Sequence, residues 1–134
     1  LVTTPEPTSI TDSYSLVKAL YKHPRFDSSE TKVKMISNRV AKEEEGENLF
    51  AKLNAVVERY LKVPMTYLGS IPQDGQVTKA VMQQNPVTLQ NPAAKASLAF
   101  ESMVETLLGE KESTSQPRRG MAAFFSHIIA RNKL

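Results

Sequence analysis

Apolar residues recur at helical spacing in several stretches of the chain. We expect the first of these helices to begin at Ser9, which would cap it together with Asp12 in a capping box. It should end before Pro24, because a proline forces the preceding residue out of the helical region. One face of this helix would be formed by Ile10, Tyr14, Val17 and Tyr21.

Two longer helices and one short helix are predicted further along. The amphipathic pattern over residues 43–61 is clear, and its three initial glutamates suit the positive end of a helix dipole. Residues 77–84 predict a short helix. Asn91 as cap and Pro92 as first helical residue predict another helix, which we expect to end at Gly109. Its apolar positions are Leu98, Phe100, Met103, Val104, Leu107 and Leu108.

Three short apolar runs between these helices predict β-strands. They are residues 1–4, residues 33–36, which we expect to stop at Ser37 and Asn38, and residues 65–71. Because strands alternate with helices, the sequence predicts an α/β fold with a mainly parallel sheet. Three strands make a small sheet of this kind, so we expect the sequence to be one part of a larger domain.

The C-terminal residues 118–134 carry the sharpest helical stripe, preceded by a polar stretch over residues 110–117 that predicts a linker. A short basic amphipathic helix suits the surface of an anionic membrane. The same stripe also suits docking on the protein's own core or binding to a partner protein. The residues concerned are Met121, Phe124, Phe125, Ile128 and Ile129 on the apolar face, with Arg118, Arg119, Arg131 and Lys133 flanking it.

Composition excludes several kinds of site. The chain has 134 residues, 40% of them hydrophobic and 23% charged, and its net charge of +3 is too small to indicate nucleic-acid binding. There is no cysteine, which excludes disulfides and thiolate metal sites. His23 and His127 have no acidic or cysteine neighbours at ligand spacing, so we predict neither a metal site nor a catalytic residue. No apolar run is long enough to cross a bilayer.

Four segments of the sequence together resemble a known family. They are TTPEPTSITDSYSLVKALY, ISNRV, the Gly-Glu-Asn-Leu-Phe start of the second helix, and YLGSIPQDGQVTKAVMQQNPV. In this order they resemble the C-terminal half of MinD-like ATPases of the ParA/MinD superfamily, and among these the FlhG/YlxH/FleN branch, which governs flagellar number and placement. MinD, the division-site regulator, is the alternative within the family.

The resemblance implies the C-terminal part of a doubly wound, mainly parallel sheet flanked by helices. Residues 1–109 would be the C-terminal half of the ATPase domain, residues 110–117 a linker and residues 118–134 a membrane-targeting helix. The family binds ATP with Mg through a phosphate loop in its N-terminal half. The five glycines of this chain, at positions 46, 69, 75, 109 and 120, include no pair close enough to cradle a phosphate. We therefore expect no ATP hydrolysis and at most weak nucleotide binding from these residues alone.

The resemblance also implies which residues would lie around adenine. Asn38 would hydrogen-bond the base, since an amide presents a donor and an acceptor side by side. Arg39 would lie against the base or contact a partner subunit, and Glu6 would lie near the nucleotide at the dimer face. Without the resemblance these are ordinary turn and capping residues. The other side of the adenine would be lined by Pro72, Gln73 and Asp74.

Partners follow from the same resemblance. It implies an intact protein that is cytoplasmic, forms a homodimer around MgATP, and contacts the inner face of the cell membrane peripherally. For the flagellar branch it implies a signal-recognition-type GTPase, FlhF, and components of the flagellar basal body as partners, and no nucleic acid. A nucleotide-independent adaptor that uses its helix surfaces for protein contacts is the alternative from a different class.

Overall fold

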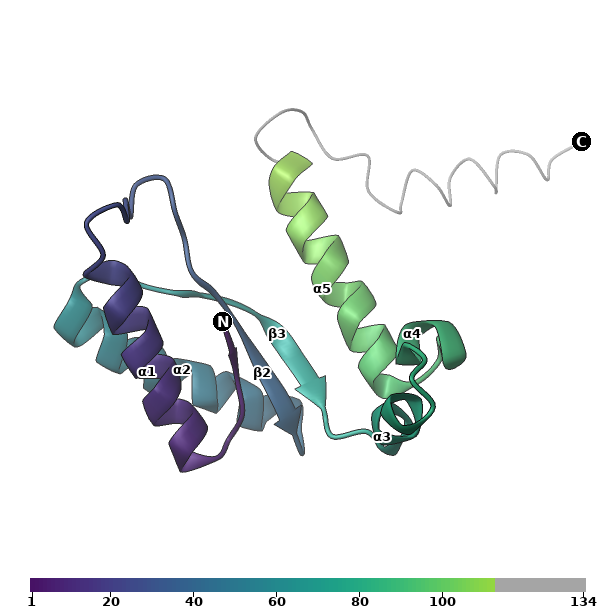
Figure 1. The fold of residues 1–134 in the computed structure, drawn as a ribbon. Coiled ribbons are helices and arrows are strands. Elements are labelled where there is room, and N and C mark those ends of the chain that lie inside the picture. Colours follow the sequence, from purple (N-terminus) through teal and green to yellow (C-terminus); the bar gives the residue numbers. More distant parts are fainter. Residues whose placement is uncertain (113–134) are drawn as a thin grey trace, which may run out of the picture. The chain divides into compact units, whose positions relative to one another are not determined.

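The computed structural model describes the backbone of residues 1–112 and the side chains of residues 1–109. The chain divides into two compact units, Leu1–Met103 and Val104–Leu134. The predicted amphipathic helix over residues 118–134 lies outside the described residues. Figure 1 shows the elements in chain order, which are β1 (Val2–Thr3), α1 (Pro7–Tyr21), β2 (Lys34–Val40), α2 (Glu43–Leu61), β3 (Thr66–Pro72), α3 (Gly75–Met82), α4 (Val87–Gln90) and α5 (Lys95–Glu112).

The three strands of the first unit form one parallel sheet in the order β1-β2-β3. Val2 pairs with Ile36 on β2, and Lys34 pairs with Thr66 on β3. Each pair of neighbouring strands is connected through a helix, α1 or α2, because parallel strands need a crossover that returns the chain to the starting edge. The α/β fold and the parallel sheet predicted from the sequence are confirmed.

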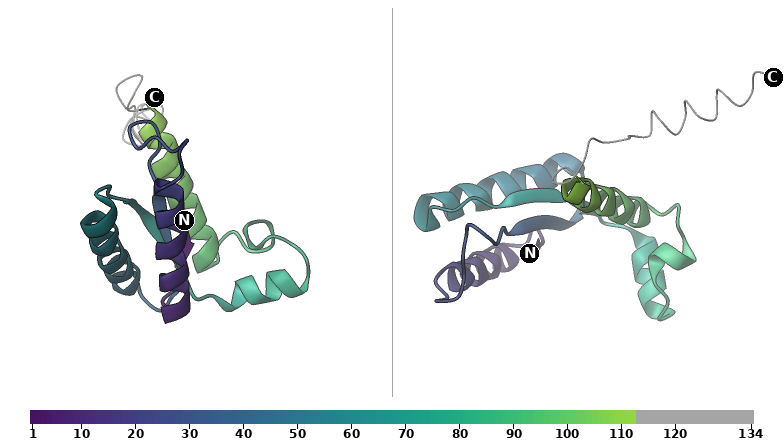
Figure 2. Two further views of the ribbon diagram at one scale, coloured as in Figure 1. Left: turned by 60° about the vertical axis from the view of Figure 1, so that its left-hand side comes forward. Right: turned by 90° about the horizontal axis from the view of Figure 1, so that it is seen from above.

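Both faces of the sheet are covered within the first unit. Helices α1 and α2 pack together on one face, where Val17 of α1 and Leu53 of α2 meet Met35 of β2 in the main core (Figures 1 and 2). On the other face, Ala96 and Met103 from the first turns of α5 pack against Ile71 of β3. The sheet is therefore the middle layer of three.

The strongly periodic helices form where the sequence predicts them. Helix α2 has the predicted bounds, and all four residues of the predicted face of α1 join the main core. Two apolar residues of α2 remain exposed, because Val56 is 40% exposed and Tyr60 is 63% exposed. The apolar stripe of α2 that packs on the sheet is thus narrower than its apolar composition indicates.

Two predicted boundaries in the first half of the chain are wrong for identifiable reasons. Helix α1 starts at Pro7, and Ser9 accepts a hydrogen bond from the Thr4 N–H instead of capping the helix. Strand β2 continues through Ser37 and Asn38 to Val40, because the polar side chain of Ser37 is paired inside the protein.

The last helix also differs from its prediction at both ends. It begins at Lys95 instead of at Pro92, and the carbonyl of Asn91 accepts a hydrogen bond from the Ser97 hydroxyl. It continues through Gly109 to Glu112, so Gly109 does not end it. The short helix α4 just before it was not predicted. Among the described residues, no helix is long and apolar enough to span a membrane.

Candidate adenine-binding hollow

The loops that follow the three strands lie at one edge of the sheet. Because the strands are parallel, the loops after Thr3, Val40 and Pro72 all leave from carboxyl ends. In open α/β sheets this edge is where ligands bind. The predicted nucleotide residues stand in these loops or at the strand ends before them.

A hollow of about 250 Å³ lies between the ends of β2 and β3. It brings together five of the six residues predicted to surround adenine. Glu6 is the sixth, and it does not line this hollow. The lining residues are Asn38, Arg39, Ile71, Pro72, Gln73, Asp74, Val77, Thr78 and Phe100.

Asn38 and Arg39 owe their positions to an irregularity at the end of β2. The pairing of β2 with β3 shifts register between Asn38 and Val40, so Arg39 is an extra residue in the strand. Arg39 has a φ of 59°, in the left-handed region that residues other than glycine rarely adopt. Its N–H donates to Oδ1 of Asn38 at 3.0 Å. This hydrogen bond holds the Asn38 amide beside the hollow with its Nδ2 group not engaged by the bond.

The guanidinium of Arg39 connects the hollow to two other loops. Its Nε donates to Oε1 of Gln73 at 3.1 Å, on the loop after β3. One of its terminal nitrogens lies 3.5 Å from Oε1 of Glu6, on the loop after β1. The structure thus places Glu6 next to Arg39 although Glu6 does not line the hollow.

Asp74 is engaged with two helix starts. Its Oδ1 accepts from the Gln76 N–H at 2.8 Å and caps α3, while its Oδ2 accepts from the Ala96 N–H at 3.1 Å in the first turn of α5. These two N–H groups, in that order of effect, and then the charge of Lys95 lower the pKa of Asp74 below its usual value. Asp74 therefore borders the hollow chiefly as a carboxylate that organises its walls.

Phe100 is a lining residue that the sequence did not identify. It lies on α5, was assigned to the apolar run of that helix, and remains 38% exposed at the hollow. An exposed phenyl ring in a hollow offers a planar surface on which a flat ring can stack. Nothing in the sequence distinguishes it from core residues, because α5 lies far from Asn38 along the chain and the fold alone brings them together.

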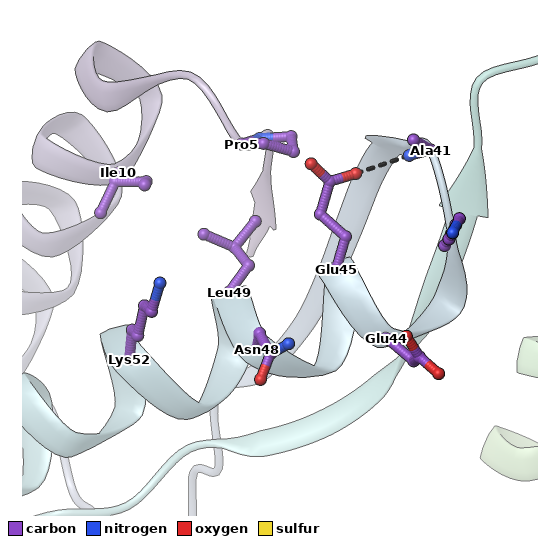
Figure 3. A pocket seen from close by; sticks show the side chains of 9 residues that line it. Pro5, Ile10, Ala41, Glu44, Glu45, Asn48, Leu49 and Lys52 are labelled. Atoms are coloured by element: carbon purple, nitrogen blue, oxygen red, sulfur yellow. Dashed lines mark hydrogen bonds between the residues drawn. The ribbon is translucent and has the colours of Figure 1, made fainter.

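A second, larger hollow of about 570 Å³ lies where the loop after β1 faces the start of α2. Figure 3 shows Pro5 and Ile10 on one side of it and Leu49 and Glu45 on α2 on the other. The Glu45 carboxylate accepts a hydrogen bond from the Ala41 N–H at 2.6 Å. Glu45 thereby satisfies an N–H group just before the start of α2, as the glutamate of a capping box does.

The described residues contain no group of three or more His, Asp or Glu side chains placed to hold a metal ion. Gly46, which lies within the first turns of α2, is buried against the sheet, so its backbone does not face a ligand. Asn38, Arg39 and Phe100 bring an amide, a guanidinium and an aromatic ring to the 250 Å³ hollow, groups that can hydrogen-bond and stack on a nucleobase.

No protein-family model matches the chain. Two relatives do. The chain is 44% identical over 105 residues to the antiactivator FleN of Pseudomonas aeruginosa, an alignment that covers 78% of this chain and 36% of FleN. It is 24% identical over 132 residues to the flagellum site-determining protein YlxH of Helicobacter pylori, covering 96% of this chain and 43% of YlxH.

These alignments agree with the resemblance that the sequence segments indicate. The chain spans about two fifths of the length of the two relatives, 36% of one and 43% of the other. The parallel sheet with helices on both faces is the arrangement that the family resemblance predicts. The chain therefore belongs to the FlhG/FleN-like branch of the MinD/ParA family and corresponds to a part of such a protein.

Proposed function

We propose that this chain supplies the adenine side of the ATP site in a regulator of flagellar number or placement. The names of the two relatives, an antiactivator and a flagellum site-determining protein, support the flagellar role over a role at the division site. The intact protein would bind MgATP, dimerise around it and hydrolyse it. Hydrolysis of the bound MgATP would supply the free energy for a change between two states of the protein.

The observation that carries the proposal is the hollow between the ends of β2 and β3. Its volume of about 250 Å³ is slightly below the roughly 300–1,000 Å³ of pockets that hold drug-sized ligands. It therefore has room for a base but not for a whole nucleotide. This size fits a chain that contributes one side of a nucleotide site.

Three lining residues would share the recognition of the base. The ring of Phe100 would stack on one face of adenine. The amide of Asn38 would donate a hydrogen bond from Nδ2 to a ring nitrogen, since its Oδ1 already accepts from Arg39. Pro72 would close the hollow with an apolar surface that carries no competing donor. Together they would exclude water from the base and fix its orientation.

Membrane association forms the second part of the proposal. The stripe over residues 118–134 would lie in the interface of an anionic bilayer, with its phenylalanines and isoleucines towards the acyl chains. One such helix binds weakly, whereas a dimer presents two, so dimerisation would control binding through avidity. FlhF-like GTPase and basal-body partners remain part of this proposal as the family resemblance implies them.

The proposal is tested by base selectivity in the intact protein. Equilibrium binding of ATP and GTP is compared between the natural protein, Asn38→Ala and the control Asn85→Ala, which removes an exposed amide that does not line the hollow. We expect Asn38→Ala to weaken ATP binding by about two- to tenfold, the effect of one hydrogen bond, and to reduce the preference over GTP. Unchanged ATP affinity and selectivity in Asn38→Ala would contradict the role of this hollow.

A further inference from the structure

Three loops, each from the end of a different strand, meet at one side chain. Arg39 stands at the end of β2, hydrogen-bonds Gln73 after β3 at 3.1 Å, and lies 3.5 Å from Glu6 after β1. Gln73 and Arg39 line the 250 Å³ hollow, whereas Glu6 lines a separate hollow along β1. Arg39 is thus a direct link between the hollow and the loop over residues 4–6.

The backbone at this position disfavours arginine. A φ of 59° suits glycine or asparagine, because a side chain in the left-handed region crowds the following carbonyl. The bulge that produces this φ turns the Arg39 side chain towards the loops instead of continuing the alternation of the strand. Strained residues of this kind cluster at sites where ligands bind or switches occur.

The link is too exposed to be explained by stability. The side chain of Arg39 is 59% exposed and that of Glu6 is 50% exposed. Ion pairs at such exposure contribute little to folding, because water screens them and both long side chains lose freedom. A contact of this strength exchanges readily when a ligand offers Arg39 or Gln73 another partner.

We propose that Arg39 is a positioning residue that couples occupancy of the hollow to the position of the loop over residues 4–6. A ligand that contacts Gln73 or Asn38 weakens or strengthens the ion pair between Arg39 and Glu6, and the loop shifts in response. By linkage, fixing or releasing the loop changes the affinity of the hollow by the same factor. The identity of the ligand as an adenine compound rests on the proposed function, whereas the coupling through Arg39 does not.

The first test needs no ligand. The amide resonance of Thr4 and the carboxyl titration of Glu6 are followed by NMR in the protein and in Gln73→Ala. Thr4 is a suitable reporter because its N–H bonds to Ser9, which lies outside the link. We expect Gln73→Ala to shift both signals, and to shift neither when Arg39 is already replaced by Met.

Two outcomes of this first test would overturn the coupling. The first is the absence of any shift at Thr4 and Glu6 in Gln73→Ala. The second is that Gln73→Ala causes equal shifts in the protein with Arg39 and in the protein with Arg39→Met. Arg39→Lys is the conservative control, because its single ammonium group attracts Glu6 without the planar fork that reaches both partners. It should restore the interaction with Glu6 but only a fraction of the response to Gln73→Ala.

The second test uses adenosine as the probe, which carries the base without phosphates. We expect the resonances of Thr78, in the hollow, and Thr4, in the loop, to saturate with one dissociation constant. Arg39→Met is expected to change the dissociation constant, but at adenosine concentrations that saturate the Thr78 shift the Thr4 shift should be absent. A Thr4 shift that survives in Arg39→Met would overturn the coupling. Absence of any adenosine shift would overturn the adenine assignment, and the first test alone would then decide the coupling.

Discussion

Ser37 donates a hydrogen bond from its hydroxyl to the carbonyl of Gly46 at 2.9 Å, which fixes the first turns of α2 above β2. Ser37 pairs in register with Thr3 on β1 and with Ser70 on β3, so a row of buried hydroxyls crosses the sheet. Thr3 shares a hydrogen bond of 2.7 Å with Ser13 of α1. These small polar side chains let both helices approach the sheet closely near the carboxyl ends of the strands.

Gly46→Ala should destabilise the protein because the sheet leaves no room for a methyl group. A Cβ at position 46 would lie 1.9 Å from the Ser70 hydroxyl and 2.8 Å from the Tyr67 hydroxyl. Overpacking of this kind costs about 1–3 kcal/mol in the free energy of unfolding, which urea denaturation measures. Gly75→Ala is the matched control, because no atom lies within 4 Å of its added methyl group. Equal stability of the two variants would contradict the close approach of α2.

Lys62→Gly should stabilise the protein. Lys62 follows the last turn of α2 with a φ of 62°, and its N–H donates to the Glu58 carbonyl at 3.1 Å. Glycine is favoured at such a left-handed helix end, and we expect a gain of about 0.5–1 kcal/mol in the free energy of unfolding. Lys52→Gly, in the middle of the same helix, should instead destabilise by about 1 kcal/mol. A loss of stability in Lys62→Gly would show that this helix end has another conformation.

Asp74 should make stability depend on pH at the acid end of the range. Its pKa is lower in the folded protein than in the unfolded chain, chiefly because of the hydrogen bond from the Gln76 N–H. Its contribution is therefore complete above the unfolded pKa of about 3.9, and is lost as the pH falls through the lower folded value. The urea midpoint of Asp74→Asn should lie below that of the natural protein by the same amount at pH 7 and pH 5, and by less at pH 3.

The comparison for this pH profile is Asp12→Asn, an exposed aspartate on α1. The urea midpoint of Asp12→Asn should differ little from that of the natural protein at all three pH values. A constant difference for Asp74→Asn from pH 7 to pH 3 would mean that the charge of the carboxylate is not what holds the starts of α3 and α5.

Membrane binding should depend on the apolar stripe near the C-terminus. Replacing Phe124 and Phe125 with Glu in the intact protein should abolish co-sedimentation with vesicles that contain anionic lipid. The double variant of Ser126 and Ala130 to Glu introduces the same two charges on the side of the predicted helix opposite the stripe, and should keep measurable binding. An equal loss of co-sedimentation in both variants would mean that the added negative charge alone prevents binding. Unchanged co-sedimentation of the phenylalanine variant would contradict membrane binding by this segment.

The sequence predicted those parts of the fold that rest on periodicity. Helix α2 has a long amphipathic repeat and acidic first residues, and its predicted bounds are correct. Strand β2 extends beyond its prediction because Ser37 and Asn38 are typical turn residues, and only the partner Gly46 makes Ser37 a strand residue. The start of α5 was missed because Asp74, distant along the chain, accepts from its Ala96 N–H.

The candidate site was predicted in its composition but not in its connections. The family resemblance pointed to Asn38 and the residues after β3, and the structure brings them to one hollow. Phe100 could not be found, since only the fold brings this residue of α5 to the hollow beside Asn38. The contacts of Arg39 with Glu6 and Gln73 depend on a bulge and a positive φ. An arginine in the sequence does not indicate either feature.

The most direct test of the adenine site is photolabelling of the intact protein with 2-azido-ATP, followed by mapping of the labelled peptides. We expect label in the peptides that contain Asn38, Pro72 to Asp74 or Phe100, and loss of that label when excess ATP is present. Label that ATP protects only elsewhere in the protein, with none in these peptides, would contradict this expectation.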